Sequence, residues 1–470
     1  MRFSAEDNFY QLTEDVNCVI IGDSAVECWI RHIVPNKILK PTCDYIGSKI
    51  IFNNNESSSD FIDFSEPVKL SVYNGGKQRD YIVNIHTFTG LPIVWIETQD
   101  RQSINSKTEY VNASFKLEEN VMTRGAGDIV NESVKIRGRG NSSWTETQKK
   151  SYRLKFDEKV SLINLPEDKS WVLLANSFDK SMLRNYIAYY IGKLSNIDYT
   201  PSFFFVELIL NGVYCGTYLL GDKLKIAEHR VNVGDDGFLL EIDERAPREK
   251  TMYFRTTHLS QPINIKEPDN VIAFDESYRY ITTYIAQAED ALFSENFTDI
   301  ETGWQKWMDI DSFVDWYIIH EIARNYDPLF LYTSAYMNLS RGGKLKMGPI
   351  WDFDVTFGNN QNPHVYPIEG LVGESSSWFN RLMQDPAFVD RVKHRYNYFY
   401  SKRSDILNEI NATAGYLKYA VEENNNRWNT FYSLGFGNHD VWGSYKNEVQ
   451  LLKDFIYKRM DWLKSEFDKM

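Results

Sequence analysis

The chain has 470 residues, more than one hydrophobic core ordinarily holds, and this length predicts about two to four domains. Its formal net charge is −13 and it has no long basic run. This argues against a general nucleic-acid binder, because neutralising phosphates requires clustered lysine and arginine. Hydrophobic residues at 43% and charged residues at 25% are typical of a globular protein and exclude extensive disorder.

Cysteine usage and hydropathy narrow the class further. The four cysteines are too few for a small disulfide scaffold, and none has the spacing of a structural zinc site. No apolar run approaches the roughly 18 residues of a membrane-spanning helix, so we expect no membrane span. The first residues, Met1–Asp7, lack the apolar stretch of a signal peptide. The protein is therefore expected to be either cytoplasmic or exported with its leader already removed.

Residues 1–90 are predicted to form a small all-β sandwich. Short segments rich in β-branched and aromatic residues alternate with turn formers. The segments are Lys49–Phe52, Val68–Tyr73 and Arg79–Ile85, and the turns are Asn53–Ser59 and Asn74–Gly76. The glycine turn between the last two segments is typical of a β-hairpin. The region resembles the immunoglobulin-like modules placed at the front of surface proteins in gut bacteria.

The rest of the chain, residues 91–470, mixes strand and helix signals. Several strands are expected between residues 93 and 156. An Asn-Gly pair at residues 211–212 predicts a hairpin between Phe203–Leu210 and Val213–Leu220. Other expected elements are helices at Ser181–Leu194, Ile310–Arg324 and Glu448–Phe467, and a strand near Phe330–Met337.

A glycine-containing loop at Ile136–Trp144 is the first candidate for chemistry. Its two glycines would let backbone N–H groups approach a phosphate, and Arg137 and Arg139 would add positive charge. The alternative is a tight turn with solvated arginines, which the local sequence alone favours.

The strand that follows, Lys149–Phe156, is the second candidate. Alternation places Tyr152, Leu154 and Phe156 on one face and Ser151, Arg153 and Lys155 on the other. The cations could hold phosphates. An ordinary amphipathic strand with a solvated face explains the pattern equally well.

Two acidic segments complete the candidates. Asp327 lies where a helix should end, because Pro328 disfavours helical geometry in the residue before it, and an acid there could serve as a base or cap a loop. Within Gly348–Asn359, an extended conformation would project Asp352 and Asp354 together, where they would repel unless a cation lay between them. Such an oxygen pair suits Mg²⁺ or Mn²⁺, whereas pairing with a basic side chain is the structural alternative. No Ser-His-Asp triad is supported.

In this order, the segments are similar to the spore-coat protein H (CotH) kinase family over roughly residues 91–470. The matching segments are Arg137–Trp144, Lys149–Phe156, Trp171–Asn185, Val206–Leu224, Gly237–Asp243, Ile265–Asp269, Asn325–Asp327 and Gly348–Asn359. The family is regarded as an atypical protein kinase. The resemblance therefore implies an α+β, two-lobed kinase-like fold, with a strand-rich N-lobe covering ATP and a helical C-lobe, preceded by the small β-sandwich.

The resemblance also implies roles for individual residues. The loop that contains Arg137, Arg139, Asn141 and Ser142 would hold the phosphates of ATP, helped by Arg153 and Lys155 on the following strand. Asp327 would be the base that accepts the proton of the acceptor hydroxyl. Asp352 and Asp354 would bind Mg²⁺ or Mn²⁺.

The chain departs from ordinary kinases in several ways. It has no HRD or DFG motif and no asparagine five residues after Asp327. Asp222 stands where many relatives of the family carry glutamate. The assignment of roles among the carboxylates is correspondingly open.

Three functions are compatible with these patterns. The first is a kinase that phosphorylates Ser/Thr of a secreted or surface protein. The second is a non-catalytic surface module that binds a protein or glycan. The third, a glycoside hydrolase, is weaker, because its carboxylates should lie on separate strands roughly 5–9 Å apart. The sandwich-like front region favours an extracytoplasmic location, and the sequence gives no oligomeric state and no nucleic-acid partner.

Overall fold

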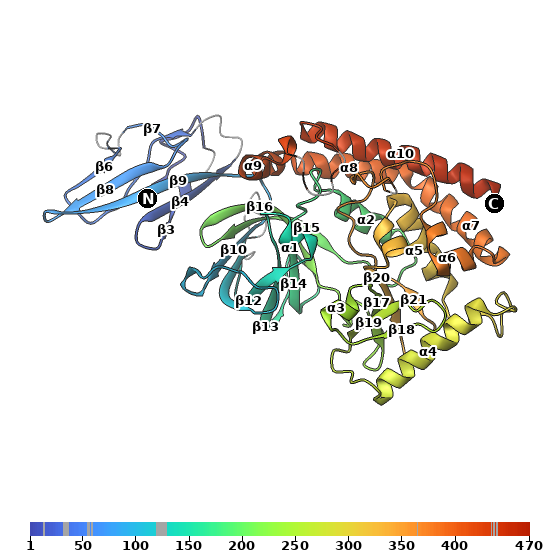
Figure 1. Ribbon diagram of the computed structural model, residues 1–470. Coiled ribbons are helices and arrows are strands. Elements are labelled where there is room, and N and C mark those ends of the chain that lie inside the picture. The colour runs from blue at the N-terminus through green and yellow to red at the C-terminus, as the bar shows by residue number, and fades with distance from the viewer. Residues whose placement is uncertain are drawn as a thin grey trace.

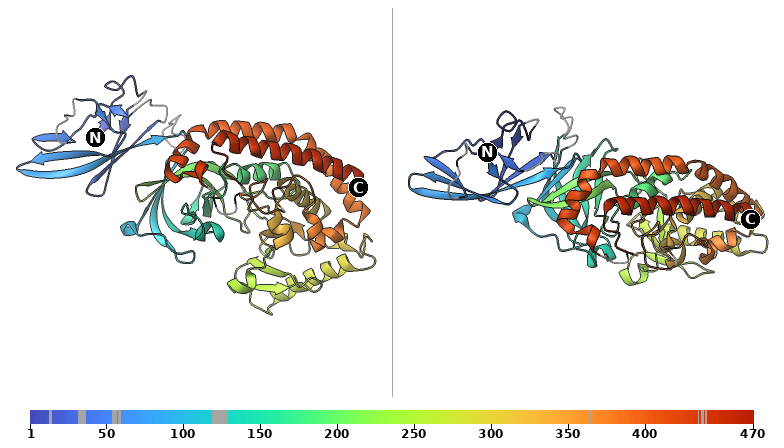
Figure 2. Two further views of the ribbon diagram at one scale, coloured as in Figure 1. Left: turned by 45° about the horizontal axis from the view of Figure 1, so that its top comes forward. Right: turned by 90° about the horizontal axis from the view of Figure 1, so that it is seen from above.

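The computed structural model describes residues 1–12, 15–31, 37–53, 57, 60–118, 129–363, 365–433, 435, 438 and 440–470. Three parts follow one another along the chain: an all-β front part, a closed barrel, and a mostly helical part that contains another sheet (Figure 1). Figure 2 shows the front part and the C-terminal end of the last helix at opposite ends of an elongated molecule. The expected α+β class is confirmed.

The front part has a five-stranded sheet, in the order β3-β4-β9-β8-β6, and two two-stranded sheets. The predicted glycine hairpin is present, because Gly75 and Gly76 join β8 to β9 and both have positive φ. The turn expected at Asn53–Ser59 lies largely outside the described residues. The strands are β1 (Arg2–Phe3), β2 (Val16–Asn17), β3 (Val19–Ile21), β4 (Ala25–Arg31), β5 (Ile38–Leu39), β6 (Lys49–Phe52), β7 (Ile62–Asp63), β8 (Val68–Asn74) and β9 (Lys77–Phe88). This part buries a hydrophobic core of its own, which includes Phe3 and Phe52.

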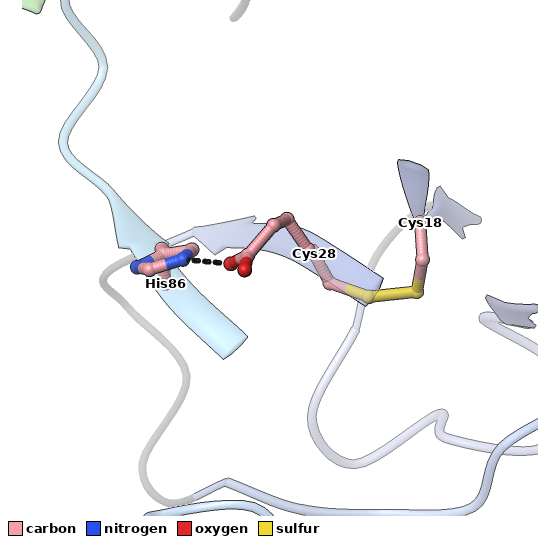
Figure 3. Close-up of a disulfide and its surroundings, with 4 residues drawn as sticks. Cys18, Cys28 and His86 are labelled. Atoms are coloured by element: carbon pink, nitrogen blue, oxygen red, sulfur yellow. Dashed lines mark hydrogen bonds and ion pairs between the residues drawn. A yellow bond between two sulfur atoms is a disulfide. The ribbon is translucent and has the colours of Figure 1, made fainter. Parts of the chain in front are cut away.

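A disulfide joins Cys18 to Cys28 in the front part (Figure 3). The two residues are 10 apart in sequence, and the antiparallel register of β3 and β4 brings them opposite each other. Beside the bridge, the Glu27 carboxylate lies 2.5 Å from Nε2 of His86. The low cysteine count excluded a disulfide scaffold but did not reveal this single bridge, because the pairing depends on the strand register.

The barrel closes in the order β10-β11-β12-β13-β14-β16-β15. Its strands are β10 (Ile93–Thr98), β11 (Val111–Glu118), β12 (Ile129–Arg139), β13 (Ser151–Val160), β14 (Asp168–Leu174), β15 (Phe203–Leu210) and β16 (Val213–Asp222). Tyr152, Leu154 and Phe156 pack inside with Trp171, as the alternation in β13 predicted. The Asn-Gly hairpin between β15 and β16 is also present. Cations therefore lie on the outer face of β12 and β13.

The helical part encloses the largest core of the molecule. Its sheet has the order β18-β19-β17-β20-β21. The strands are β17 (Phe238–Ile242), β18 (Tyr253–Arg255), β19 (Pro262–Glu267), β20 (Ala335–Leu339) and β21 (Lys346–Met347). The principal helices are α2 (Arg184–Lys193), α4 (Glu276–Phe293), α5 (Ile310–Ala323), α6 (Ser377–Leu382), α7 (Pro386–Ser401), α8 (Arg403–Tyr416), α9 (Lys418–Trp428) and α10 (Tyr445–Lys469). None of the helices in the described ranges combines the length and apolarity needed to cross a membrane.

Two predicted elements differ from the structure. The strand expected near Phe330–Met337 begins only at Ala335, because Asp327–Leu331 forms a π-helical turn first. The helix expected from Ser181 begins at Arg184. There the Asp179 carboxylate accepts hydrogen bonds from the backbone N–H groups of Ser181 and Arg184, and these bonds hold a turn before the helix.

The front part contacts the barrel through aromatic and polar groups. Trp29 of β4 packs edge-on against Trp95 of β10, with ring centroids 4.3 Å apart. The Thr89 hydroxyl, just after β9, donates a 2.5 Å hydrogen bond to the Glu207 carboxylate in β15. Both contacts involve side chains on each side of the boundary predicted at residue 90.

Candidate functional site

A small polar cavity of about 40 Å³ lies where the barrel meets the helical part. Its walls come from the ends of β12 and β14, the start of β13, helix α2 and the segment after β21. The lining residues are Arg139, Ser143, Ser151, Leu174, Asn176, Ser177, Asn185, Tyr189, Trp351, Asp352 and Asp354. Three of the predicted site residues, Arg139, Asp352 and Asp354, therefore meet in one place.

The two glycines of the Ile136–Trp144 loop make room for side chains of the loop itself. A Cβ on Gly138 would lie 2.3 Å from the ring of Trp144, and one on Gly140, whose φ is +98°, would lie 2.2 Å from the Ser143 hydroxyl. The strand can therefore turn sharply after Arg139, whose guanidinium lies 5.4 Å from the centre of the Trp351 ring. The glycines position Arg139 and Ser143 at the cavity, and no direct contact of their backbone with a phosphate is needed to explain them.

A row of arginines extends from the cavity along the outer face of the barrel. Arg137 in β12 pairs directly with Arg153 in β13, and the guanidinium of Arg137 lies 5.1 Å from the centre of the Tyr110 ring. The Nε atoms of both arginines are buried and have no hydrogen-bond partner among the described residues. Burial lowers the pKa of Arg153, Tyr110 and Glu267 oppose this shift, and the neighbouring Arg137 and Arg139 add to it. Such crowded like charges would be relieved by an anion.

The other predicted phosphate-binding residues lie further away. Lys155 is exposed on the outer face of β13, opposite Lys135, and does not line the cavity. Asn141 and Ser142 are exposed at the rim, and Lys107 donates a hydrogen bond to the side-chain oxygen of Asn141. The prediction that Lys155 contacts phosphates at this site is therefore not supported. The strand alternation placed it on the correct face but too far along the strand.

Asp352 and Asp354 approach the cavity from an irregular segment. The extended conformation expected for this segment is wrong, because Asp352 has a φ of +69°. Both carboxylates nevertheless reach the cavity, where Asp352 keeps access to solvent and Asp354 is half-buried. The surrounding protein raises the pKa of both. The charges of Asp352, Asp179 and Asp327 raise that of Asp354 further, while Arg139 and Arg245 oppose the shift at Asp352.

Asp327 lies beside this pair at the first position of the π-helical turn, after α5 ends. Burial and the charge of Asp352 raise its pKa to about 6, and Arg245 opposes the shift. Arg245 is oriented by Asp243, whose carboxylate accepts a 2.8 Å hydrogen bond from its Nε. A carboxyl group with this pKa is ionised at neutral pH and can still accept a proton readily.

The residues around the cavity fit a divalent cation that is shared with a ligand. No cluster of three or more His, Cys, Asp or Glu side chains suited to a metal ion occurs in the described parts of the chain. Mg²⁺ characteristically uses one or two carboxylates and completes its shell with water and phosphate oxygens. Asp352 and Asp354 are the residues that would hold it, and the charge of Asp352 raises the pKa of Asp354.

Three residues around this cluster were not predicted to act there. Asn185 and Tyr189 come from α2, and the available signal was an asparagine among the mostly apolar and aromatic residues of that helix. The phenol of Tyr189 lies near Asp352, Asp354 and Arg139, and burial raises its pKa well above the usual value. Arg245 comes from the turn after β17, and nothing in its local sequence distinguishes it from a surface arginine.

Comparison with known proteins identifies one family. The family model described as CotH kinase protein matches residues 136–463, which includes the barrel from the last residues of β12 onward and nearly all of the helical part. No curated protein matches the chain. The matched region contains every residue that lines the cavity, together with Asp327 and Arg245.

Proposed function

Because the chain belongs to the CotH kinase protein family, we propose that it is an atypical protein kinase that transfers the γ-phosphate of ATP to serine or threonine of a secreted or surface protein. The observation that carries this proposal is the meeting of Arg139, Asp352 and Asp354 in one cavity, with Asp327 beside them. Phosphoryl transfer requires positive charge on the phosphates, carboxylates for a divalent cation and a base near the acceptor. Arg139, the Asp352–Asp354 pair and the neighbouring Asp327 would meet these three requirements.

In this proposal the barrel is the strand-rich lobe over ATP, and the helical part is the second lobe. A cavity of about 40 Å³ has room for a few water-sized groups and therefore for the end of a triphosphate, but not for a whole nucleotide. The rest of the nucleotide would extend along the outer face of the barrel, where Arg137 and Arg153 lie side by side on β12 and β13. Charge-assisted contacts with those arginines would hold the other phosphates.

Asp327 is assigned the role of base. In the transfer it accepts the proton of the acceptor hydroxyl while that oxygen bonds to the γ-phosphorus and the bond to the β–γ bridging oxygen breaks. Arg245 keeps Asp327 largely ionised at neutral pH by lowering its pKa. Asp352 and Asp354 would hold Mg²⁺ or Mn²⁺, which would neutralise the negative charge of the phosphates.

A non-catalytic binding module is the second candidate, and the small cavity favours it. A cleft this narrow must open to admit a nucleotide, whereas a module that binds a protein or glycan elsewhere would not need to open. Two measurements separate the candidates. The first is calorimetry of ATP binding with and without Mg²⁺, and the second is transfer of the labelled γ-phosphate of ATP to dephosphorylated casein. The kinase proposal expects Mg²⁺-dependent binding and label transfer. Absence of Mg²⁺-dependent ATP binding would leave the binding module.

We also propose an extracytoplasmic location. The Cys18–Cys28 disulfide supports it, because thiols in the cytosol are kept reduced in most organisms. Mass spectrometry of protein alkylated directly in cells tests this proposal. We expect Cys18 and Cys28 to escape alkylation while Cys43 and Cys215 remain available as thiols after denaturation. Alkylation of all four residues would contradict it.

A further inference from the structure

The segment that carries Asp352 and Asp354 has no regular secondary structure, yet buried side chains bind its backbone at four places. The donors and acceptors come from α2, from the end of α5 and from the segment itself. The bonds are Asn325 Nδ2 to Asp352 O (3.1 Å), Phe353 N to Asn185 Oδ1 (2.8 Å), Asn359 Nδ2 to Asp354 O (2.7 Å) and Arg184 Nε to Thr356 O (3.1 Å). All four side chains that make these bonds are more than nine-tenths buried.

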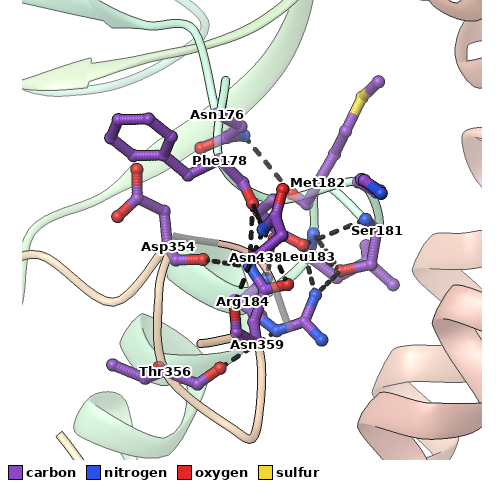
Figure 4. A network of polar contacts seen from close by, with 12 residues as sticks. Asn176, Phe178, Ser181, Met182, Leu183, Arg184, Asp354, Thr356, Asn359 and Asn438 are labelled. Atoms are coloured by element: carbon purple, nitrogen blue, oxygen red, sulfur yellow. Dashed lines mark hydrogen bonds and ion pairs between the residues drawn. The ribbon is translucent and has the colours of Figure 1, made fainter. Parts of the chain in front are cut away.

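Asn359 has a special place in this network, because it bonds the peptide of Asp354 directly (Figure 4). Its amide also donates a 2.8 Å hydrogen bond to the carbonyl of Phe178, in the turn before α2. Asn438, from the chain before α10, donates to the same carbonyl at 2.6 Å and to the Asn359 side-chain oxygen at 3.1 Å. Asn359 therefore ties the carboxylate segment to the turn before α2.

The turn that receives Asn359 is itself held firmly. Arg184 and Asp179 form an ion pair in which the side chains are 3% and 0% exposed, and Arg184 also binds the carbonyl of Thr356. This second tie to the same segment is visible in Figure 4, where Arg184, Thr356 and Asn359 surround one end of the loop. The contacts fix the loop on both sides of Gly358.

We propose that Asn359 is a positioning residue that keeps Asp354 directed into the cavity next to Asp352, so that the cation site is formed before a cation binds. The proposal rests on the proposed function, because it takes the two aspartates to be the cation ligands. Two neighbouring carboxylates repel, and an irregular loop would separate them unless its backbone were held. Asn359 supplies that restraint through the backbone carbonyl of Asp354 and has no hydrogen bond to the carboxylate that would bind the cation.

Substitution of Asn359 by alanine tests the proposal, with Asn338→Ala as the matched control. Asn338 is equally buried and donates a 3.1 Å hydrogen bond to the carbonyl of Gly348. That carbonyl lies before Asp352–Thr356, the stretch whose backbone the four hydrogen bonds hold. Asn359→Ser serves as a milder second variant if alanine prevents folding. Mn²⁺ affinity in the presence of ATP is measured by electron paramagnetic resonance of free Mn²⁺, ATP affinity without metal by calorimetry, and stability by thermal melting.

We expect Asn359→Ala to weaken Mn²⁺ about ten- to a hundredfold, the usual effect of losing a group that orients a metal ligand. ATP affinity without metal should change less than about twofold. Asn338→Ala should lower the melting temperature comparably and leave Mn²⁺ affinity unchanged. Equal Mn²⁺ affinity in wild type and both Asn359 variants, or equal loss in the Asn338 control, would overturn the positioning role. A wild-type protein that shows no metal-dependent ATP binding would instead overturn the proposed function.

Discussion

The two sides of the candidate site, the arginines of the barrel and the carboxylates of the helical part, are built in different ways. On one side, Arg137, Arg139 and Arg153 belong to regular strands, and their direction follows from alternation along β12 and β13. On the other side, Asp352 and Asp354 belong to an irregular segment whose shape depends on hydrogen bonds to side chains far away in the sequence. The placement of the arginines therefore follows from local sequence, while the placement of the two carboxylates depends on the tertiary fold.

The difference has a consequence for mutagenesis. A substitution on the strand side should remove one charge and leave the strand in place, because the ladder hydrogen bonds come from the backbone. A substitution of a side chain that binds the backbone of the Asp352–Asn359 segment should displace both carboxylates at once.

Asp327→Asn should reduce phosphoryl transfer by about 10²–10⁴-fold, because it removes the proposed base. Mg²⁺-dependent ATP binding should change little, since a base acts in the transition state and a metal ligand acts in the ground state as well. Asp354→Asn should instead remove the Mg²⁺ dependence of binding. Calorimetry and label transfer on both variants measure these effects. Loss of Mg²⁺-dependent binding in Asp327→Asn alone would mean that the two roles are exchanged.

Arg139→Ala should weaken ATP by about ten- to a hundredfold and adenosine hardly at all, because a charge-assisted contact with phosphate contributes roughly 1.5–3 kcal/mol. Lys155→Ala, on the same face of the barrel but exposed and away from the cavity, is the matched control and should change ATP affinity less than about twofold. Equilibrium binding of the two ligands decides the question. A larger effect of Lys155→Ala would restore the prediction made from strand alternation.

The rate of transfer should rise with pH through about 6, the raised pKa of Asp327, and level off above about 7. The direction follows from the role of the group: the protonated carboxyl is inactive as a base, so acid reduces the rate about tenfold for each pH unit below 6. The pH profile of kcat/KM at saturating Mg²⁺ measures it. The residual activity of Asp327→Asn serves as control and should not show this rise, whereas a rise that persisted there would assign the titration to another group.

Much of the regular secondary structure could be predicted from the sequence. The hairpins at Gly75-Gly76 and at Asn211-Gly212, the inward face of β13 and the helix at Ile310–Ala323 all follow from local patterns of turn residues and hydrophobicity. Each of these elements carries its signal within a short stretch of sequence, which is why hydrophobic pattern and turn chemistry suffice to predict it.

The candidate site could be predicted only in part, for a physical reason. Asp352 and Asp354 were predicted to lie together, and both line the cavity, but their expected extended conformation was wrong, because Asp352 has positive φ and a tertiary hydrogen bond from Asn325 holds its carbonyl. Arg245 and Asn359 lie 82 and 32 residues from Asp327, respectively, by their numbering. Only the folded chain brings Arg245 near Asp327 and Asn359 onto the backbone of Asp354.

The smallest expected effect concerns the boundary between the front part and the barrel. A chain of residues 91–470 keeps every residue of the cavity but loses the hydrogen bond from Thr89 to Glu207, whose pKa burial raises to about 7. It also uncovers Trp95, which Trp29 covers in the full chain. A chain that begins at Thr89 retains the hydrogen bond and is the matched control.

We expect both truncated chains to bind ATP with Mg²⁺ as the full chain does, because none of the described residues before Arg139 lines the cavity. The chain of residues 91–470 should be less stable than the one that begins at Thr89 by about 0.5–1.5 kcal/mol, the net contribution of an ordinary hydrogen bond. Urea unfolding and calorimetry measure the two quantities. If residues 91–470 fold but fail to bind ATP while the full chain binds it, then the front part shapes the nucleotide site. The arginine side of the site would then also depend on tertiary contacts, as the carboxylate side does.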